Sequence, residues 1–261
     1  MKRTLQIANG FSLIITIVIN YLSNTGIFNG NTMASVSARY QNLFTPSGYA
    51  FSIWGLIYLG LSAFIIYQGR SLFNKDANDQ VVMNTGWWFV LSCVANCTWV
   101  LAWLYEYTAL SVLIMVALLF CLLRIILSVN KMQPDAPVKI FAIWPFSIYT
   151  AWICVALMAN IAAWLTKMQW NAFGIAETIW AIVMICVAGA ILLSVSWGRN
   201  MPGFSLVGAW ALMAIAVADW NKAHLVTQAA LVVSVILLIG FILQVLKNYK
   251  RSPEKKSIHL N

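Results

Sequence analysis

The sequence predicts an all-α integral membrane protein, a polytopic bundle of about eight transmembrane helices. Of its 261 residues, 62% are hydrophobic and 9% are charged, which leaves too little polar surface to cover a soluble globule. Apolar runs of about 20 residues, long enough to cross a hydrocarbon layer of roughly 30 Å, also recur along the whole chain. Lipid is therefore the expected solvent of most side chains, and the bilayer is the first predicted partner.

The predicted helices follow one another with short loops. They are expected at residues 5–23, 49–68, 81–104, 108–128, 139–165, 172–197, 204–219 and 226–247. The first run follows Met1-Lys2-Arg3 and resembles a signal peptide, but it is longer than a signal-peptide core and no small-residue cleavage site follows it cleanly. We therefore expect it to be retained as a helix. The run at 204–219 is short enough to be re-entrant instead of spanning.

The basic residues predict the orientation, because Lys and Arg collect in cytoplasmic loops. The expected topology puts 13 of the 16 Lys and Arg on one face and leaves Arg39, Lys167 and Lys222 on the other. Both termini are thus expected in the cytoplasm, and the strong bias fits a bacterial cytoplasmic (inner) membrane. The net charge of +9 lies beside helix ends and in the tail Lys247 to Lys256, which favours anionic lipid over nucleic acid as a partner.

One loop, at about residues 24–48, is much longer than the others. It is rich in Asn, Gly, Ser and Thr and also carries apolar side chains such as Ile27, Phe28 and Phe44. Two interpretations stay open at this point: a lid or plug over an outward-facing cavity, or a loosely ordered surface loop.

Polar and aromatic side chains within the runs are the candidates for a site, because a polar group in hydrocarbon must be paired or line a cavity. The second, third and fifth runs carry Trp54, Tyr58, Asn96, Trp99, Tyr149, Trp152, Asn160 and Trp164. Any one of these is explained by interfacial anchoring or by hydrogen bonds between helices. As a set, aromatic rings and amides at matched depth favour a site for a mostly apolar ligand.

Their spacing resembles the TspO/MBR family, the tryptophan-rich sensory proteins and translocator proteins. The family's Pro, eight residues before a Trp that is followed four later by Tyr, appears as Pro46, Trp54 and Tyr58. Its Asn-x-x-Trp appears as Asn96 and Trp99. Its Tyr-x-x-Trp, with Asn eight residues on and Trp four beyond, appears as Tyr149, Trp152, Asn160 and Trp164. Gly48 stands where the family often has a second aromatic, which bears on ligand preference more than on fold.

The resemblance covers residues 1–165 and implies a TspO-like five-helix ligand-binding core there, with residues 166–261 as a three-helix membrane extension that ends in a basic cytoplasmic tail. It implies a receptor or sensor that binds bulky apolar ligands, tetrapyrroles or sterols, in an intramembrane aromatic cavity. The indoles of Trp54, Trp99 and Trp152 would stack on the ligand. Asn96 and Asn160 would supply hydrogen bonds, while Tyr58 and Tyr149 would line the wall. No cofactor is required, although a bound porphyrin fits the resemblance, and family members often form homodimers.

A secondary transporter of a small molecule is the alternative, with Glu177 and Asp219 as proton or cation sites. The competing structural interpretation is that Glu177 caps its helix and Asp219 lies in interfacial water. An enzyme is not expected, because we find no Ser-His-Asp set and no phosphate-cradling glycine loop. Photochemistry on a bound porphyrin is the only catalytic route we can write. The five cysteines lie in apolar runs away from both histidines, so no metal site is predicted.

Overall fold

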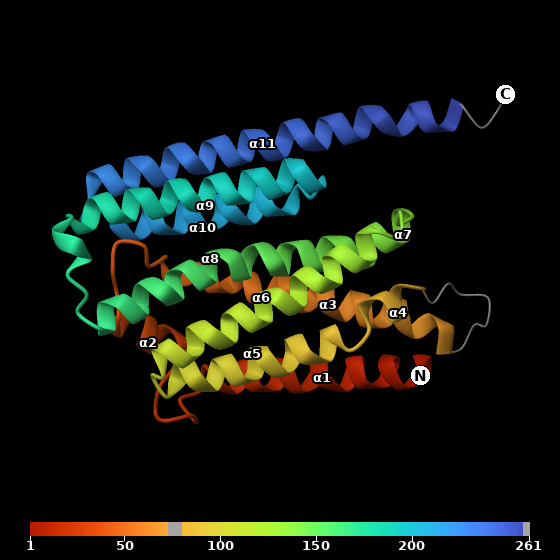
Figure 1. Cartoon of the computed structure of the whole chain (residues 1–261), viewed down its shortest axis with the longest axis horizontal. Coiled ribbons are helices and arrows are strands. Elements are labelled where there is room, and N and C mark those ends of the chain that lie inside the picture. The colour runs from red at the N-terminus through yellow and green to blue at the C-terminus, as the bar shows by residue number, and fades with distance from the viewer. Residues whose placement is uncertain (73–79, 258–261) are drawn as a thin grey trace.

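A computed structural model describes residues 1–72 and 80–257, with side chains up to residue 250. The described ranges are helical with no strand, in agreement with the predicted class (Figure 1). The elements are α1 (Lys2–Leu22), α2 (Met33–Arg39), η1 (Gly48–Ser52), α3 (Ile53–Gly69), η2 (Arg70–Leu72), α4 (Gln80–Thr85), α5 (Trp88–Leu104), α6 (Thr108–Asn130), α7 (Ala136–Val138), η3 (Lys139–Ile143), α8 (Trp144–Lys167), η4 (Ala172–Gly174), α9 (Glu177–Arg199), α10 (Gly203–Asp219) and α11 (His224–Ser257).

Six helical stretches in the described ranges are long and apolar enough to cross a membrane. They are Lys2–Leu22, Gly48–Leu72, Thr108–Asn130, Ala136–Lys167, Glu177–Arg199 and His224–Lys250. The apolar helices α5 and α10 are shorter, with 17 residues each. The third predicted run is interrupted at Gly86, whose φ of 53° ends α4 before α5 begins. The chain is thus a helical membrane protein, and the number of eight crossings stays a prediction.

The helices pack in two groups that share one core. In Figure 1, α9, α10 and α11 lie together along one side of the bundle that contains α1, α3, α5, α6 and α8. Helix α10 packs against α11, α9 and α8, so it joins the two groups. The backbone N–H of Ser47, before η1, donates to the carbonyl of Ala214 in α10 at 2.9 Å. One continuous cluster of buried side chains includes residues of both groups. The division at residue 165 stays a prediction.

Close packing of the last three helices depends on small residues. A Cβ built on Gly208 of α10 would lie 2.6 Å from Leu192 Cδ1 and 2.9 Å from Leu237 Cδ1, which belong to α9 and α11. At Gly189 of α9 it would lie 2.3 Å from Val233 Cγ1. Helix pairs in membranes commonly approach through such residues, because lipid gives no hydrophobic driving force between helices.

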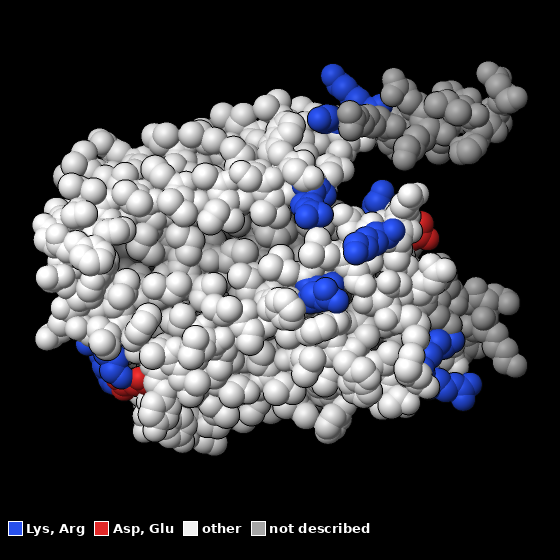
Figure 2. Space-filling model, in the orientation of Figure 1, with Lys and Arg blue, Asp and Glu red and all other residues white. Residues whose placement is uncertain are grey.

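The basic residues are distributed unevenly over the molecule. Figure 2 shows most of the visible Lys and Arg side chains at the end where Figure 1 places both termini, with a small mixed-charge cluster at the opposite end. We call the end opposite the termini the outer end. Assignment of the basic end to the cytoplasm, and of the protein to a bacterial inner membrane, stays a prediction.

The long loop is folded. Its α2 begins with a capping box, in which the Thr32 hydroxyl accepts from the Ser35 N–H and the Ser35 hydroxyl accepts from the Thr32 N–H. Met33, Val36 and Phe44 are buried. We call residues 24–48 the lid segment, because α2 lies across a pocket described next. The alternative of a loosely ordered surface loop is therefore wrong.

Candidate functional site

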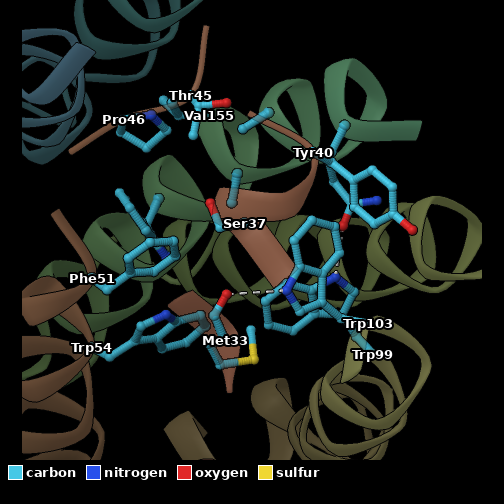
Figure 3. Close-up of a pocket in the computed structure, with 15 residues that line it drawn as sticks. Met33, Ser37, Tyr40, Thr45, Pro46, Phe51, Trp54, Trp99, Trp103 and Val155 are labelled. Carbon is cyan, nitrogen blue, oxygen red and sulfur yellow. Dashed lines mark hydrogen bonds between the residues drawn. The ribbon is translucent and has the colours of Figure 1, made fainter. Parts of the chain in front are cut away.

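The centre of the candidate site is a pocket between the lid segment and helices α3, α5 and α8 (Figure 3). We call it the aromatic pocket. It is lined by Met33, Ser37, Tyr40, Thr45, Pro46, Phe51, Trp54, Trp99, Trp103, Trp152, Val155, Ala156, Ala159, Asn160 and Ala163. Four of the eight residues selected from the sequence, Trp54, Trp99, Trp152 and Asn160, are among them.

Indoles from three separate helices meet at this pocket. The ring centroid of Trp54 on α3 lies 6.4 Å from that of Trp99 on α5 and 6.5 Å from that of Trp152 on α8. Trp103, one turn after Trp99, stacks on it at 6.5 Å and donates from Nε1 to the Met33 carbonyl of α2 at 3.5 Å. Sequence reasoning missed Trp103, although its i+4 spacing from Trp99 placed both rings on one helix face.

Three predicted residues lie behind the pocket instead of lining it. Tyr58 stacks on Trp54 with centroids 5.6 Å apart, and Tyr149 meets the same indole edge-on at 5.7 Å. Asn96 donates to the Tyr149 hydroxyl at 3.0 Å and accepts from Asn20 of α1 at 2.7 Å. These contacts hold Trp54 in place from its far side. Trp164, the eighth predicted residue, is half-buried on α8 and is not among the lining residues.

Asn160 lines the pocket, but its amide is already engaged. Its Oδ1 accepts from Trp99 Nε1 at 3.1 Å, and its Nδ2 donates to Ser111 Oγ at 2.8 Å. The amide therefore fixes the Trp99 ring, while hydrogen bonding to a ligand stays a prediction. Trp152 Nε1 is buried and finds no partner among the described residues, so it is a free donor on a lining side chain.

The enclosed space is small. Its volume is about 50 Å³, whereas drug-sized ligands occupy pockets of roughly 300–1,000 Å³. A tetrapyrrole or a sterol does not fit while α2 stays in place. Entry of any bulky ligand therefore requires the lid segment to move away from the indoles.

A polar clamp holds the lid segment shut at the outer end. Glu106, in the turn between α5 and α6, ion-pairs with Arg39 and accepts from the Tyr40 hydroxyl. Lys167 Nζ donates to the Glu106 carbonyl at 2.6 Å, and Asn31 of the lid donates to the Leu104 carbonyl at 2.9 Å. We call Arg39, Tyr40 and Glu106 the lid clamp. Sequence reasoning named Arg39 and Lys167 only for topology and did not single out Glu106.

The clamp shifts the pKa values of Glu106 and Tyr40, which lie outside the long helices of the bundle. The hydrogen bond from Tyr40, together with the positive charge of Arg39, lowers the pKa of Glu106 from its ordinary value of 4.5, although partial burial opposes this. Burial and the bond to the Glu106 carboxylate raise the pKa of Tyr40. Glu106 is therefore ionised in the closed clamp.

A second, larger hollow lies at the outer end between the lid segment and the α8–α9 connection. We call it the outer groove, and its volume is about 460 Å³. It is lined by Gln41, Asn42, Leu43, Phe44, Ala162, Leu165, Thr166, Gln169, Trp170, Asn171, Ala172, Ile175, Glu177, Trp180, Ala181 and Met184. Sequence reasoning did not predict it, because its two walls are far apart in the chain.

The two acids of the transporter hypothesis occupy different environments. Glu177 is exposed in the outer groove, and its Oε1 accepts from the Leu43 N–H at 3.2 Å. It begins α9 and is the acidic residue of its first turn, as the capping interpretation expects, although its side chain makes no cap hydrogen bond. Asp219 at the end of α10 is 2% exposed and its Oδ2 has no hydrogen-bond partner among the described residues. The expectation that it lies in interfacial water is wrong.

No group of three or more His, Cys, Asp or Glu that could hold a metal ion comes together in the part of the chain that the structure describes. A family model described as TSPO-like protein matches residues 6–243, which extends beyond residue 165 into α11. No curated protein and no solved structure matches the chain.

Proposed function

Because the chain belongs to the TSPO-like protein family, we propose that it is a membrane receptor or sensor that binds a bulky apolar ligand, of the tetrapyrrole or sterol type, in the aromatic pocket. The observation that carries the proposal is the convergence of indoles from three helices, since the ring centroids of Trp99 on α5 and Trp152 on α8 lie 6.4 Å and 6.5 Å from that of Trp54 on α3. Flat apolar molecules gain most from such a site, because stacked indoles remove large apolar areas from water and lipid headgroups. Homodimer formation and an inner-membrane location belong to the same proposal.

The residues selected from the sequence have different roles in this proposal. Trp54, Trp99 and Trp152 stack on the ligand, and the unpartnered Nε1 of Trp152 donates to a polar atom on it. Tyr58, Tyr149 and Asn96 position Trp54, and Asn160 positions Trp99. Trp164 is retained from the family pattern without a contact to the pocket.

Binding is coupled to the lid segment, since the closed pocket holds only about 50 Å³. A ligand that takes the place of the contact between Met33 and Trp103 binds the open lid better than the closed lid. It therefore shifts the equilibrium toward the open lid. The position of α2 at the outer surface is then the signal that a partner reads.

Fluorescence titration with protoporphyrin tests this function. We expect saturable quenching of tryptophan emission in the wild type and a clear loss of affinity in Trp54→Phe and Trp152→Phe. Trp197→Phe is the matched control, because this indole is exposed on α9 and does not line the pocket. The proposal fails if quenching does not saturate, or if the pocket variants bind as the control does.

Transport is the second candidate, and the buried Asp219 favours it. A carboxylate oxygen without a partner among the described residues is costly in a membrane protein and is typical of proton pathways. In reconstituted vesicles, proton-coupled uptake that is abolished by Glu177→Gln or Asp219→Asn would support transport. Ligand binding without flux would support the receptor.

A further inference from the structure

We propose that the outer groove is a second binding site, which takes an organic ammonium ion with a short apolar tail. The site is independent of the proposed receptor function, because Glu177, Trp170 and Trp180 do not line the aromatic pocket. Its volume of about 460 Å³ falls within the range of small-molecule sites, roughly 300–1,000 Å³. No lid movement is needed to admit such a ligand.

The groove has a polar mouth and an apolar floor. The mouth carries amides from both walls, among them Asn42 and Asn171. The floor lies farther from the outer end. With a helical rise of 1.5 Å per residue, Leu165 lies about 3 Å inward from Lys167, the last residue of α8. Met184 lies about 10 Å inward from Glu177, the first residue of α9. An amphipathic ligand therefore fits with its polar head at the mouth and its apolar part between the two helices.

The charge of the groove selects a cation. Glu177 is the single lining residue with a formal charge, and it forms no ion pair among the described residues. Lys167 donates to the Glu106 carbonyl, and the charges of both Lys222 and Glu177 act on the nearby Asp219, which adds a second carboxyl group close to the groove. The C-terminal end of α8 and the N-terminal end of α9 meet at the groove, so their dipoles oppose each other and leave the carboxylate as the net charge.

Two indoles beside the carboxylate complete the recognition of an ammonium group. The rings of Trp170 and Trp180 lie 5.4 Å apart at an angle of 54°, and both line the groove. Trp180 is held by a hydrogen bond from its Nε1 to the Ala172 carbonyl at 2.9 Å. An indole face attracts a cation more strongly than other aromatic rings do. A carboxylate and two indoles that line one groove form an arrangement that binds alkylated amines.

Calorimetric titration of the full chain in nanodiscs tests the site, with benzylamine as the probe and benzyl alcohol as its neutral counterpart of similar size. We expect saturable binding of benzylamine and at least about tenfold weaker binding of benzyl alcohol. Glu177→Gln should weaken benzylamine binding by about tenfold, and Trp180→Phe by a few-fold. Trp197→Phe on the opposite half of α9 serves as the control for the indole change and should bind as the wild type does.

Two bilayers distinguish a lipid headgroup from a free amine. If the ammonium of phosphatidylethanolamine occupies the groove, benzylamine binds more weakly in discs of that lipid than in discs of phosphatidylglycerol, and Glu177→Gln removes the difference. Equal affinity in the two bilayers assigns the groove to a free organic amine. The proposal is overturned if Glu177→Gln binds benzylamine as tightly as the wild type does, or if the wild type binds benzyl alcohol equally well.

Discussion

Replacement of Glu106 by glutamine should open the lid segment. The side chains of Arg39 and Glu106 are 50% and 21% exposed, so their ion pair contributes only about 0.2–1 kcal/mol. The Tyr40 hydrogen bond to a carboxylate becomes a bond to a neutral amide, which costs about 1 kcal/mol. The sum, roughly 1–2 kcal/mol, raises the population of the open lid by about 5–30-fold.

The consequence is kinetic, because the closed pocket of about 50 Å³ admits no bulky ligand. In stopped-flow quenching with protoporphyrin, the association rate of Glu106→Gln should exceed that of the wild type by about 5–30-fold. Lys222→Gln removes a charge at the same end of the molecule outside the lid clamp and should leave the rate unchanged. An association rate in Glu106→Gln that equals or falls below the wild-type rate would refute the coupling of clamp, lid and pocket.

Three further predictions follow from the same contacts. The clamp lowers the pKa of Glu106, so its stabilisation of the closed lid is complete above the ordinary value of 4.5 and is lost as the pH falls through the lowered value. Porphyrin association should therefore accelerate below pH 4.5 in the wild type and not in Glu106→Gln. Asn160→Ala leaves Trp99 Nε1 without its acceptor, so it should cost about 1–3 kcal/mol of stability in thermal unfolding and also weaken porphyrin binding. Gly208→Ala overpacks α10 against α9 and α11 and should lower stability by about 1–3 kcal/mol, whereas Gly198→Ala, with nothing within 4 Å, should not.

The helices were predictable because each long apolar run has one way to satisfy its backbone in lipid. The predicted boundaries of α6, 108–128, lie within two residues of the observed Thr108–Asn130. The break at Gly86 was not predicted, since a glycine within an apolar run does not by itself reveal a positive φ. Whether α5 and α10 span the bilayer depends on loops and neighbours that composition does not encode.

The site was predictable only in part, because partners of polar groups are set by tertiary contacts. Asn96 was expected to face a ligand, yet its amide is satisfied by Asn20 of α1, a residue no motif connects with it. Glu106 was overlooked because its role arises from Arg39 and Tyr40, which are more than 60 residues away in the sequence. Trp54 and Trp99, which were selected because they lie at matched depth in their apolar runs, both line the pocket, and their binding of a ligand stays a prediction.

The selectivity of the proposed receptor for bulky apolar ligands follows from the cost of opening its lid. Met33 and Val36 belong to the lid segment and are buried while it is closed, and full exposure of side chains of this kind costs about 1.5–3 kcal/mol each. A small polar molecule that enters the aromatic pocket leaves these surfaces uncovered, so it does not offset that cost. A large flat apolar molecule covers both the indoles and the displaced face of α2. The lid clamp adds a polar contribution that is similar for every ligand, because Arg39 and Glu106 separate whichever molecule enters. Discrimination between ligands therefore resides in the apolar area that each one buries, and the clamp lowers the association rate and the affinity of every ligand by a similar factor.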